Sequence, residues 1–274
     1  MTRLITEQVA QIPQNLDLYD LELRNKTGCN LRELAAGTAG IDLEKLFMKK
    51  NKVAVIPVTA GEGKIEGFSE ALKAIALHLD FDAVVAKESD VRGLVEAYEN
   101  KFDLIMLADD YQYAAINLHS RKVADNDRAT ACGYVYAFKK MAGSLKGRDV
   151  LLIGAGAVGS LAAQFLALEG ANLQINDLNR QKAEELARLT GNKFGVKAVA
   201  VMNIEEILPS AELIFDASPV PGLIPADLLN NSACIAAPGI PLGLTPEAAK
   251  LAEKRLIHDP LQIGTAVMLY TALQ

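Results

Sequence analysis

The chain has 274 residues, half of them apolar, and a formal net charge of −6. This acidic balance argues against a nucleic-acid partner, because phosphate binding needs clustered positive charge. Its longest apolar runs are interrupted within about ten residues, short of the roughly 20 that a membrane-spanning helix needs. With no apolar stretch of signal-peptide length at the start, we expect a cytoplasmic protein of two domains without membrane association.

The first half of the chain predicts helices followed by a small α/β unit. Residues 1–48 are expected to be helical, and the apolar run 53–58 predicts a strand. Pro57 suits an edge strand or the end of a strand, because proline donates no ladder hydrogen bond. Apolar residues recur at helical spacing over 68–79, which predicts a helix. Further strands are predicted at residues 83–86 and 104–107.

The second half begins after a helix predicted over residues 130–141. From Val150 onward short apolar strands alternate with helices, which predicts a parallel sheet covered by helices on both faces. Asn179 is expected to cap a helix that runs through Leu189 and ends at Gly191. A later helix begins where Thr245 precedes Pro246. The predicted strands after the one at Val150 are residues 172–176, 198–202, 212–217, 233–237 and 256–258.

A glycine-rich loop follows the strand at Val150, in the sequence VLLIGAGAVG. Gly154 permits a tight turn, Gly156 lets the backbone approach a pyrophosphate, and Gly159 lets the next helix pack closely. Asp177, about 20 residues further on, ends the next strand and would accept hydrogen bonds from adenosine ribose hydroxyls. The predicted phosphate cradle comprises Gly154, Ala155, Gly156, Ala157, Val158 and Gly159.

The same loop predicts NAD as the cofactor. The Asp177 carboxylate would repel the 2′-phosphate of NADP, and no arginine directly follows it. Arg180 either flanks the adenine or lies on the surface of its helix, and the sequence leaves both open.

These features predict an α/β protein with a C-terminal Rossmann NAD-binding domain, an N-terminal α/β domain with a leading helical segment, and a cleft between them. We expect residues 1–127 to form the substrate and catalytic domain and 128–147 the linking helix and loop. Residues 148–260 are expected to form the Rossmann domain and 261–274 a helix at the cleft.

Ligands of open α/β sheets bind beyond the carboxyl ends of the strands. This rule places the loops after the fourth, fifth and sixth strands of the second domain at the cofactor, with the last helix near the nicotinamide. The cofactor contacts predicted in these loops are Ser218, Pro219, Pro238, Gly239, Ile263, Gly264 and Thr265.

Candidate catalytic residues follow the third strand of the first domain. Asp109 at that strand end can either hold a substrate ammonium or move a proton, whereas for Asp110 a cap or turn is equally open. Residues 125–127 form a second polar cluster, which is either a helix N-cap or part of the cleft. The histidines and cysteines lack metal-ligand spacing, so no metal is predicted. No nucleophile elbow, Walker loop or zinc motif is found.

Five segments, in order over nearly the full length, resemble the PylD family of pyrrolysine synthases. The strand and turn at 53–63 and the terminal segment at 263–270 are the most specific of them. The segments are VAVIPVTAGEG (53–63), MLADD (106–110), ADN (124–126), APGIP (237–241) and IGTAVMLY (263–270).

This resemblance implies NAD-dependent oxidation of the terminal amine in the ornithine part of 3-methyl-D-ornithyl-N6-L-lysine. The resulting imine or semialdehyde loses ammonia and closes onto the α-amine, giving pyrrolysine. The resemblance implies that Asp109 is the catalytic carboxylate. The family has a serine where this chain has Ala60, so its hydrogen bond must come from Thr59, backbone or water. The implied substrate-binding residues are Leu4, Val58, Thr59, Ala60, Phe68 and Asn126.

Two other classes stay open beside this hypothesis. One is another two-domain dehydrogenase of the shikimate or methylene-tetrahydrofolate type, although the Lys/Asp or Tyr/Lys pair of those enzymes is not found on adjacent strand ends. The other is a non-catalytic NAD sensor. The expected partner is a small-molecule substrate, and a homodimer is kept as a hypothesis for the assembly.

Overall fold

The structure is a computed structural model that describes residues 4–46 and 50–274. The chain divides into two compact units. The first comprises residues 1–25, 29–133 and 260–274, and the second comprises 26–28 and 134–259. The last segment of the chain therefore belongs to the same unit as the first. The predicted helical character of residues 1–3 and 47–48 lies outside the described residues.

Helices lead the first unit, as predicted. Helix α3 shows the local cause: the Asn30 side chain accepts from the Glu33 N–H, and the Glu33 carboxylate accepts from the Asn30 N–H. This reciprocal capping box satisfies two backbone donors that the helix start leaves open. Gly40 then ends the helix with a φ of 68°. The leading helices are α1 (Thr6–Val9), α2 (Ile12–Thr27), α3 (Leu31–Ala39) and α4 (Leu43–Leu46).

A five-stranded mixed sheet follows, in the order β2-β1-β3-β4-β5. Strand β1 pairs in parallel with β2 and β3, whereas β4 runs antiparallel to β3 and β5. The sequence analysis did not predict β4 and β5, each of which follows a polar turn. The strands are β1 (Lys52–Val55), β2 (Asp82–Val85), β3 (Leu104–Ala108), β4 (Tyr113–Asn117) and β5 (Val123–Asp125).

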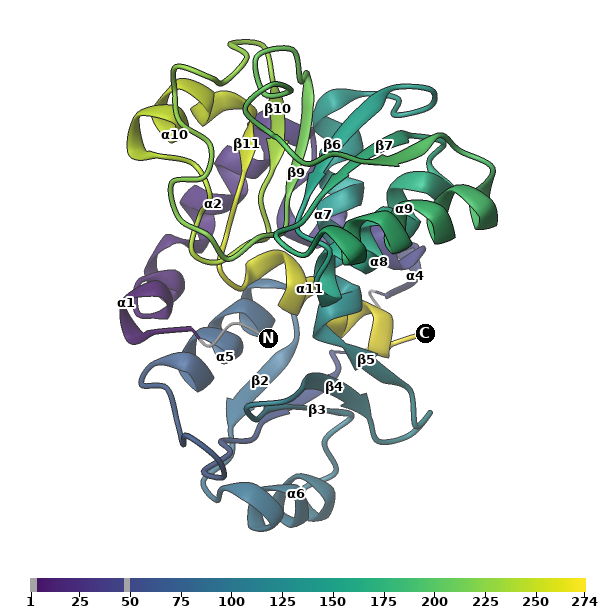
Figure 1. Ribbon diagram of the computed structural model, residues 1–274. Helices are drawn as coiled ribbons and strands as arrows, with labels where there is room; N and C mark the ends of the chain where they lie inside the picture. The colour runs from purple at the N-terminus through teal and green to yellow at the C-terminus, as the bar shows by residue number, and fades with distance from the viewer. Residues whose placement is uncertain (1–3, 47–49) are drawn as a thin grey trace. The chain divides into compact units, whose positions relative to one another are not determined.

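Helices cover both faces of this sheet (Figure 1). Helix α5 (Phe68–His78) packs against β1 and β2, and α11 (Gln262–Ala272) packs against β4, β5 and α3. Helix α6 (Asp90–Glu99) lies on the opposite face, where Ala97 is buried with Ala54 and Ile105.

Helix α7 (Asn126–Ala142) leads from the first unit into the second. The second unit holds a six-stranded sheet in the order β11-β10-β9-β6-β7-β8, and all of its pairings are parallel. This order and direction are those of a Rossmann domain, so the predicted fold class is confirmed. The strands are β6 (Asp149–Ile153), β7 (Asn172–Asn176), β8 (Ala198–Ala200), β9 (Leu213–Asp216), β10 (Cys234–Ala236) and β11 (Leu256–Ile257).

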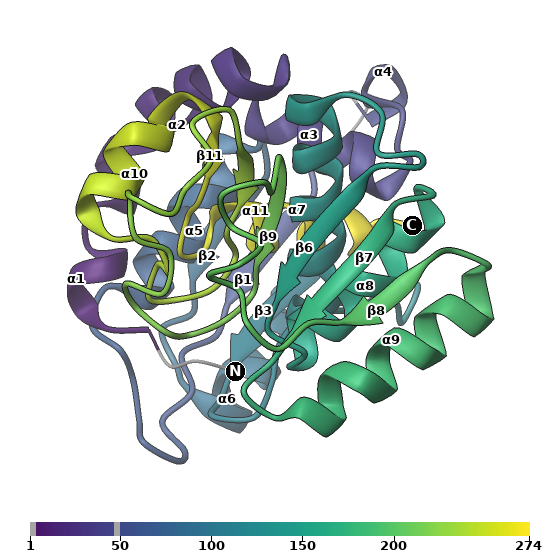
Figure 2. The ribbon, with the colours of Figure 1, turned by 45° about the horizontal axis from the view of Figure 1, so that its top comes forward.

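The helices of the second unit match the predicted pattern with one correction. Helices α8 (Ala157–Leu168) and α9 (Arg180–Phe194) run beside β7 and β8 (Figure 2). The prediction that Gly191 ends α9 is wrong: the helix continues to Phe194, and Gly195 ends it with a φ of 69°. Gly191 is tolerated inside the helix because a helical φ is open to glycine as well.

The remaining elements are α10 (Pro246–Ala252), which Thr245 caps as predicted, and the 3₁₀ turn η1 (Glu253–Arg255). None of the helices within the described ranges combines the length and apolar character that a bilayer crossing requires.

Candidate active site

The glycine loop of the second unit turns sharply between β6 and α8. Gly154 has a φ of 92°, which disfavours any residue with a side chain. A Cβ on Gly159 would lie 1.9 Å from the Gly154 carbonyl oxygen, so only glycine lets the helix start this close to the turn. The two glycines thus form the turn that the sequence predicted.

Gly156 has a different role. A Cβ built there would meet nothing within 4 Å, and the residue is exposed. It is the N-cap of α8 and supplies no side-chain cap, so Ala157 and Val158 in the first turn offer backbone N–H groups. Open space in front of free N–H groups at a helix start fits a pyrophosphate. The cradle from Gly154 to Gly159 therefore fits a dinucleotide.

Asp177 lies directly after β7 and is bonded to the glycine loop. Its Oδ2 accepts from the Ala155 N–H at 2.7 Å, and its Oδ1 accepts from the Asn179 N–H at 2.8 Å. Each carboxylate oxygen keeps a further lone pair, and the side chain is half-buried. These bonds hold Asp177 where the ribose of a bound dinucleotide is expected. Arg180 is exposed and pairs with Glu184 at 2.7 Å, which favours the helix-surface interpretation.

The loops after β9 and β10 are joined through Asp216, which the sequence analysis did not single out. Its Oδ1 accepts from the Ser218 N–H at 3.0 Å and from the Ser218 hydroxyl at 2.7 Å. Its backbone oxygen accepts from the Gly239 N–H at 3.1 Å. The predicted cofactor residues Ser218 and Gly239 are thus brought together, with Pro219 and Pro238 beside them in the chain.

Burial of Asp216 has an electrostatic consequence. The carboxyl group is fully buried, and none of the described residues gives its Oδ2 a hydrogen-bond partner. Desolvation raises the pKa of Asp216, although the two bonds from Ser218 oppose the shift. The group is therefore held in its neutral form further up the pH scale than an exposed aspartate.

In the first unit, acidic side chains fix the loop after β1. Asp90 accepts from the Thr59 N–H at 2.7 Å and from the Thr59 hydroxyl at 2.5 Å, and these bonds lower the pKa of Asp90. Asp110 accepts from the Glu62 N–H at 2.8 Å. The Thr59 hydroxyl proton is therefore engaged, so Thr59 can stand in for the serine hydroxyl that Ala60 lacks only as a hydrogen-bond acceptor. The sequence analysis did not single out Asp90, because it lies 31 residues from Thr59 and no spacing rule links the two.

Asp109 lies in the turn between β3 and β4. Its Oδ1 accepts from the Tyr111 and Gln112 N–H groups, both at 2.8 Å, and the residue is exposed. These backbone hydrogen bonds lower the pKa of Asp109, and the bond from Gln112 contributes most. An ionised carboxylate with a free second oxygen is suited to hold an ammonium group.

The start of α11 meets the start of α7 and the ring of Tyr113. The Tyr113 and Thr265 hydroxyls lie 3.0 Å apart and are buried, and Phe68 packs edge-on against the Tyr113 ring at 5.8 Å between centroids. A Cβ on Gly264 would lie 2.9 Å from Asn126 Oδ1, so that side chain rests against α11. Phe68, Asn126, Gly264 and Thr265 are thus gathered in the first unit, together with Tyr113, which the sequence analysis missed.

Other predicted residues are placed at the edges of this group. Leu4 precedes α1, which packs against α5 near Phe68, and Val58 adjoins Thr59 in the loop after β1. Ile263 is fully buried in α11 and touches the position of Gly133. Asp125 accepts from the Arg128 N–H, so in the cluster at 125–127 it caps α7. Within the described residues, no group of three His, Cys, Asp or Glu side chains could hold a metal ion.

The six-stranded parallel sheet and its glycine loop define the class: the fold is that of NAD(P)-binding dehydrogenases. Quinate dehydrogenase from Corynebacterium glutamicum in complex with NAD shares it, with a TM-score of 0.56 and 18% identity over 81% of this chain and 93% of that one. The ligand-free 5-ketofructose reductase of a Gluconobacter strain gives a TM-score of 0.55 at 16% identity, over 82% of this chain and 93% of that one. Residues 137–229 match the shikimate/quinate 5-dehydrogenase family model.

Sequence comparison narrows this class. Residues 8–124 match the model for the N-terminal domain of the pyrrolysine biosynthesis protein PylD. The whole chain is 32% identical to the pyrrolysine synthase of Methanosarcina barkeri over 98% of that protein, and 31% identical to that of Methanosarcina acetivorans over 100%. The chain belongs to the PylD family, and the resemblance predicted from five segments is confirmed.

Proposed function

We propose that the protein is a NAD-dependent oxidoreductase that oxidises the terminal amine of 3-methyl-D-ornithyl-N6-L-lysine, after which the product closes to pyrrolysine in the cytoplasm. End-to-end similarity to two pyrrolysine synthases is the observation that carries this proposal. The open cradle at Gly156 and the positioned Asp177 support NAD as the cofactor.

The proposed reaction needs a hydride acceptor and a group that binds the substrate amine. Bound NAD supplies the hydride acceptor, and the substrate amine must lose a proton as its carbon loses the hydride. Asp109, ionised through its turn, holds and orients the amine as an ammonium group. Its lowered pKa makes Asp109 a weaker base than an ordinary aspartate, but the carboxylate is still a far stronger base than water, so it takes the ammonium proton and passes it to solvent at the exposed turn.

The substrate-binding residues support an apolar chain with a polar end. Phe68 and Val58 are half-buried and supply apolar contact, and Asn126 offers an amide. The Asp90 bonds hold Thr59 and the adjoining Ala60 in one position, so backbone groups of this loop take the place of the missing serine hydroxyl.

The assay that tests the proposal follows NADH absorbance and product mass after the protein is mixed with NAD and 3-methyl-D-ornithyl-N6-L-lysine. We expect NADH and pyrrolysine in equal amounts. Shikimate and quinate serve as alternative substrates, because residues 137–229 match the shikimate/quinate dehydrogenase model. If the protein oxidises shikimate or quinate but not the amine, it is a shikimate-type dehydrogenase instead. If it binds NAD but turns over none of these substrates, it is a NAD sensor instead.

The role of Asp109 is tested by Asp109→Asn. The amide keeps the turn by accepting through Oδ1 but removes the negative charge, so we expect kcat/KM to fall about 10²- to 10⁴-fold with NADH affinity unchanged. Asp110→Asn is the matched control, because its amide oxygen can still accept from the Glu62 N–H. Equal turnover in wild type and Asp109→Asn would remove Asp109 from the mechanism.

A further inference from the structure

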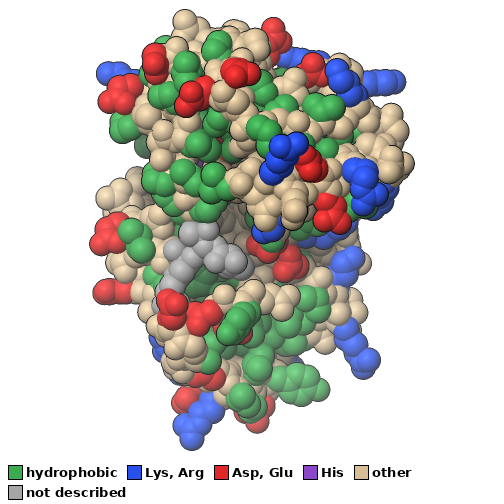
Figure 3. Space-filling model, viewed as in Figure 1, with side chains coloured by type: hydrophobic (Ala, Val, Ile, Leu, Met, Phe, Trp, Pro, Cys, Tyr) green, Lys and Arg blue, Asp and Glu red, His purple; other side chains and the backbone are tan. Residues whose placement is uncertain are grey.

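Helix α6 turns an apolar stripe outward. Val91, Leu94, Val95 and Tyr98 follow the i, i+3, i+4, i+7 spacing of one helix face, and their exposed fractions range from 37% to 74%. Hydrophobic side chains gather over α6 at the bottom of the space-filling view (Figure 3). A surface helix normally turns such an apolar stripe toward the core of its own chain. In α6 the stripe faces solvent instead.

The inward face of α6 explains why the stripe remains outside. Gly93 and Ala97 are the buried residues, and a Cβ on Gly93 would lie 2.6 Å from the Ile56 side chain and 2.8 Å from the Glu88 carbonyl oxygen. The helix lies so close to the sheet that only small residues fit beneath it. Rotation of α6 to bury Val91 or Tyr98 is therefore blocked by the packing.

The sheet beneath α6 continues the apolar surface to both of its edges. Directly paired residues point to the same face, and one row crosses all five strands. Ala54 and Ile105 in the middle are buried with Ala97, whereas Val84 and Val123 at the ends are 39% and 54% exposed. The row runs Val84, Ala54, Ile105, Ile116, Val123.

We infer that the α6 face, consisting of the stripe with Val84 and Val123, is the surface through which two copies of this chain pair, with their α6 helices antiparallel about a two-fold axis. A stable interface buries about 800 Å² on each partner, more than one helix of 10 residues offers. The exposed ends of the sheet row supply additional area. An isologous contact of this kind uses the same patch twice.

Charge placement favours a second copy over an unrelated partner. Arg92 and Glu99 are seven residues apart, so they lie on one flank of the stripe. If the two-fold axis passes between Leu94 and Val95, the two α6 helices run antiparallel and the same flank of each helix faces the other. Arg92 of each copy then comes within one helical turn of Glu99 of the other, and opposite charges meet twice.

Sedimentation equilibrium of the full chain over a wide concentration range tests the inference. We expect a dimer whose dissociation constant rises at least about tenfold in Val95→Glu, because two carboxylates then meet near the axis. Leu168→Glu, at an apolar position on α8 that is 66% exposed against 50% for Val95, is the control and should leave the constant unchanged. Circular dichroism and NADH binding check that each variant is folded.

Charge reversal distinguishes pairing of α6 with α6 from pairing through another face of the molecule. Arg92→Glu alone and Glu99→Arg alone each bring like charges together and should weaken the dimer. The double variant should restore the constant to near the wild-type value, because opposite charges then meet again across the two-fold axis. A wild-type chain that stays monomeric, or a dimer that neither Val95→Glu nor the reversals affect, overturns the inference.

Discussion

The carboxyl group of Asp216 couples the cofactor loops to pH. Because burial raises its pKa in the folded state above the ordinary aspartate value of 3.8, the folded chain keeps a proton that the unfolded chain releases. Stability from this group is thus fully present below about pH 4 and declines as pH rises toward the folded pKa. Gly243 makes the burial possible, since a Cβ there would lie 2.0 Å from Asp216 Oδ2.

Asp216→Asn should remove this pH dependence. The amide cannot ionise, and its oxygen still accepts from Ser218. We expect the unfolding free energy of the variant, relative to wild type, to increase with pH above about pH 4, by at most about 1.4 kcal/mol per pH unit. Urea unfolding at a series of pH values measures the difference.

Ser218→Ala is the matched control for this prediction. It removes one hydrogen bond to Asp216 but keeps the buried carboxyl group. It should lower stability at every pH and retain the wild-type decline above pH 4. A difference between wild type and Asp216→Asn that stays constant with pH would show that Asp216 is ionised in the fold.

At the scale of single residues, the sequence predicted the residues that bind a ligand more readily than the residues that hold those in place. The spacing of Gly154, Gly159 and Asp177 indicated a dinucleotide, because that motif has a fixed local geometry. Asp90 and Asp216 act on Thr59 and Ser218 through hydrogen bonds whose geometry depends on the folded loops. No spacing rule signals such bonds, so these two residues emerged only from the structure.

At the scale of elements, two glycines in the turn between β6 and α8 have different roles: Gly159 allows close packing of the helix, and Gly156 leaves space for the cofactor. Gly159→Ala forces a Cβ against the Gly154 carbonyl oxygen, whereas Gly156→Ala meets no protein atom within 4 Å. We expect Gly159→Ala to lower the thermal midpoint strongly, by an overpacking cost of about 1–3 kcal/mol or more. Gly156→Ala should keep the wild-type midpoint and weaken NADH binding at least about tenfold, because its methyl group enters the pyrophosphate space.

Calorimetry of both variants, with NADH titration followed by fluorescence, checks this contrast. Ala157→Gly, one residue further on, removes a methyl group at the exposed first residue of α8 but keeps the backbone N–H, so it should bind NADH normally. If Gly156→Ala bound NADH as tightly as wild type, the cradle would not be the pyrophosphate site.

The elements that sequence reasoning missed share a physical cause. Helix α5 and strand β7, whose apolar residues follow a helical or strand pattern, were predicted near their observed bounds. Strand β4 pairs with β3 across the turn that Asp109 closes, and β5, with 3 residues, pairs only with β4. Pairing energy of this kind depends on a neighbouring strand, so the segment itself carries no periodic signal.

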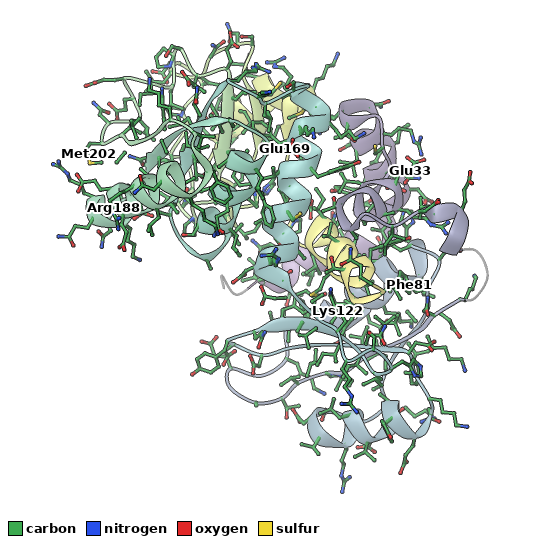
Figure 4. All side chains as sticks on the ribbon, turned by 90° about the vertical axis from the view of Figure 1, so that its right-hand side faces the viewer. Glu33, Phe81, Lys122, Glu169, Arg188 and Met202 are labelled. Carbon is green, nitrogen blue, oxygen red and sulfur yellow. The ribbon has the colours of Figure 1, made fainter. Side chains whose placement is uncertain are left out.

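At the scale of the whole molecule, the first unit is assembled from both ends of the chain. Every residue of α11 except Thr271 is buried. The Tyr270 hydroxyl accepts from Arg32 at 3.3 Å, and its ring packs edge-on against Phe81, which is labelled beside α11 in Figure 4. The Asn117 amide donates to the Ala272 carbonyl oxygen at 3.0 Å. The first unit therefore lacks a central core helix until the last residues of the chain are in place.

A chain that ends at Leu261 should lose the first unit and keep the second. Removing α11 exposes the apolar side chains of α3, α5 and β4 that it covers. Each Å² of lost burial costs about 25 cal/mol, against a net domain stability of only about 5–15 kcal/mol. We expect limited proteolysis to degrade residues before Gly133 rapidly and to leave a resistant fragment near 134–259 that still binds NADH. Leu269→Ala, a milder change at a fully buried position of α11, should destabilise only the first unit, by about 2–5 kcal/mol. A truncated chain whose first unit resists proteolysis as wild type does would show that α11 is not part of its core.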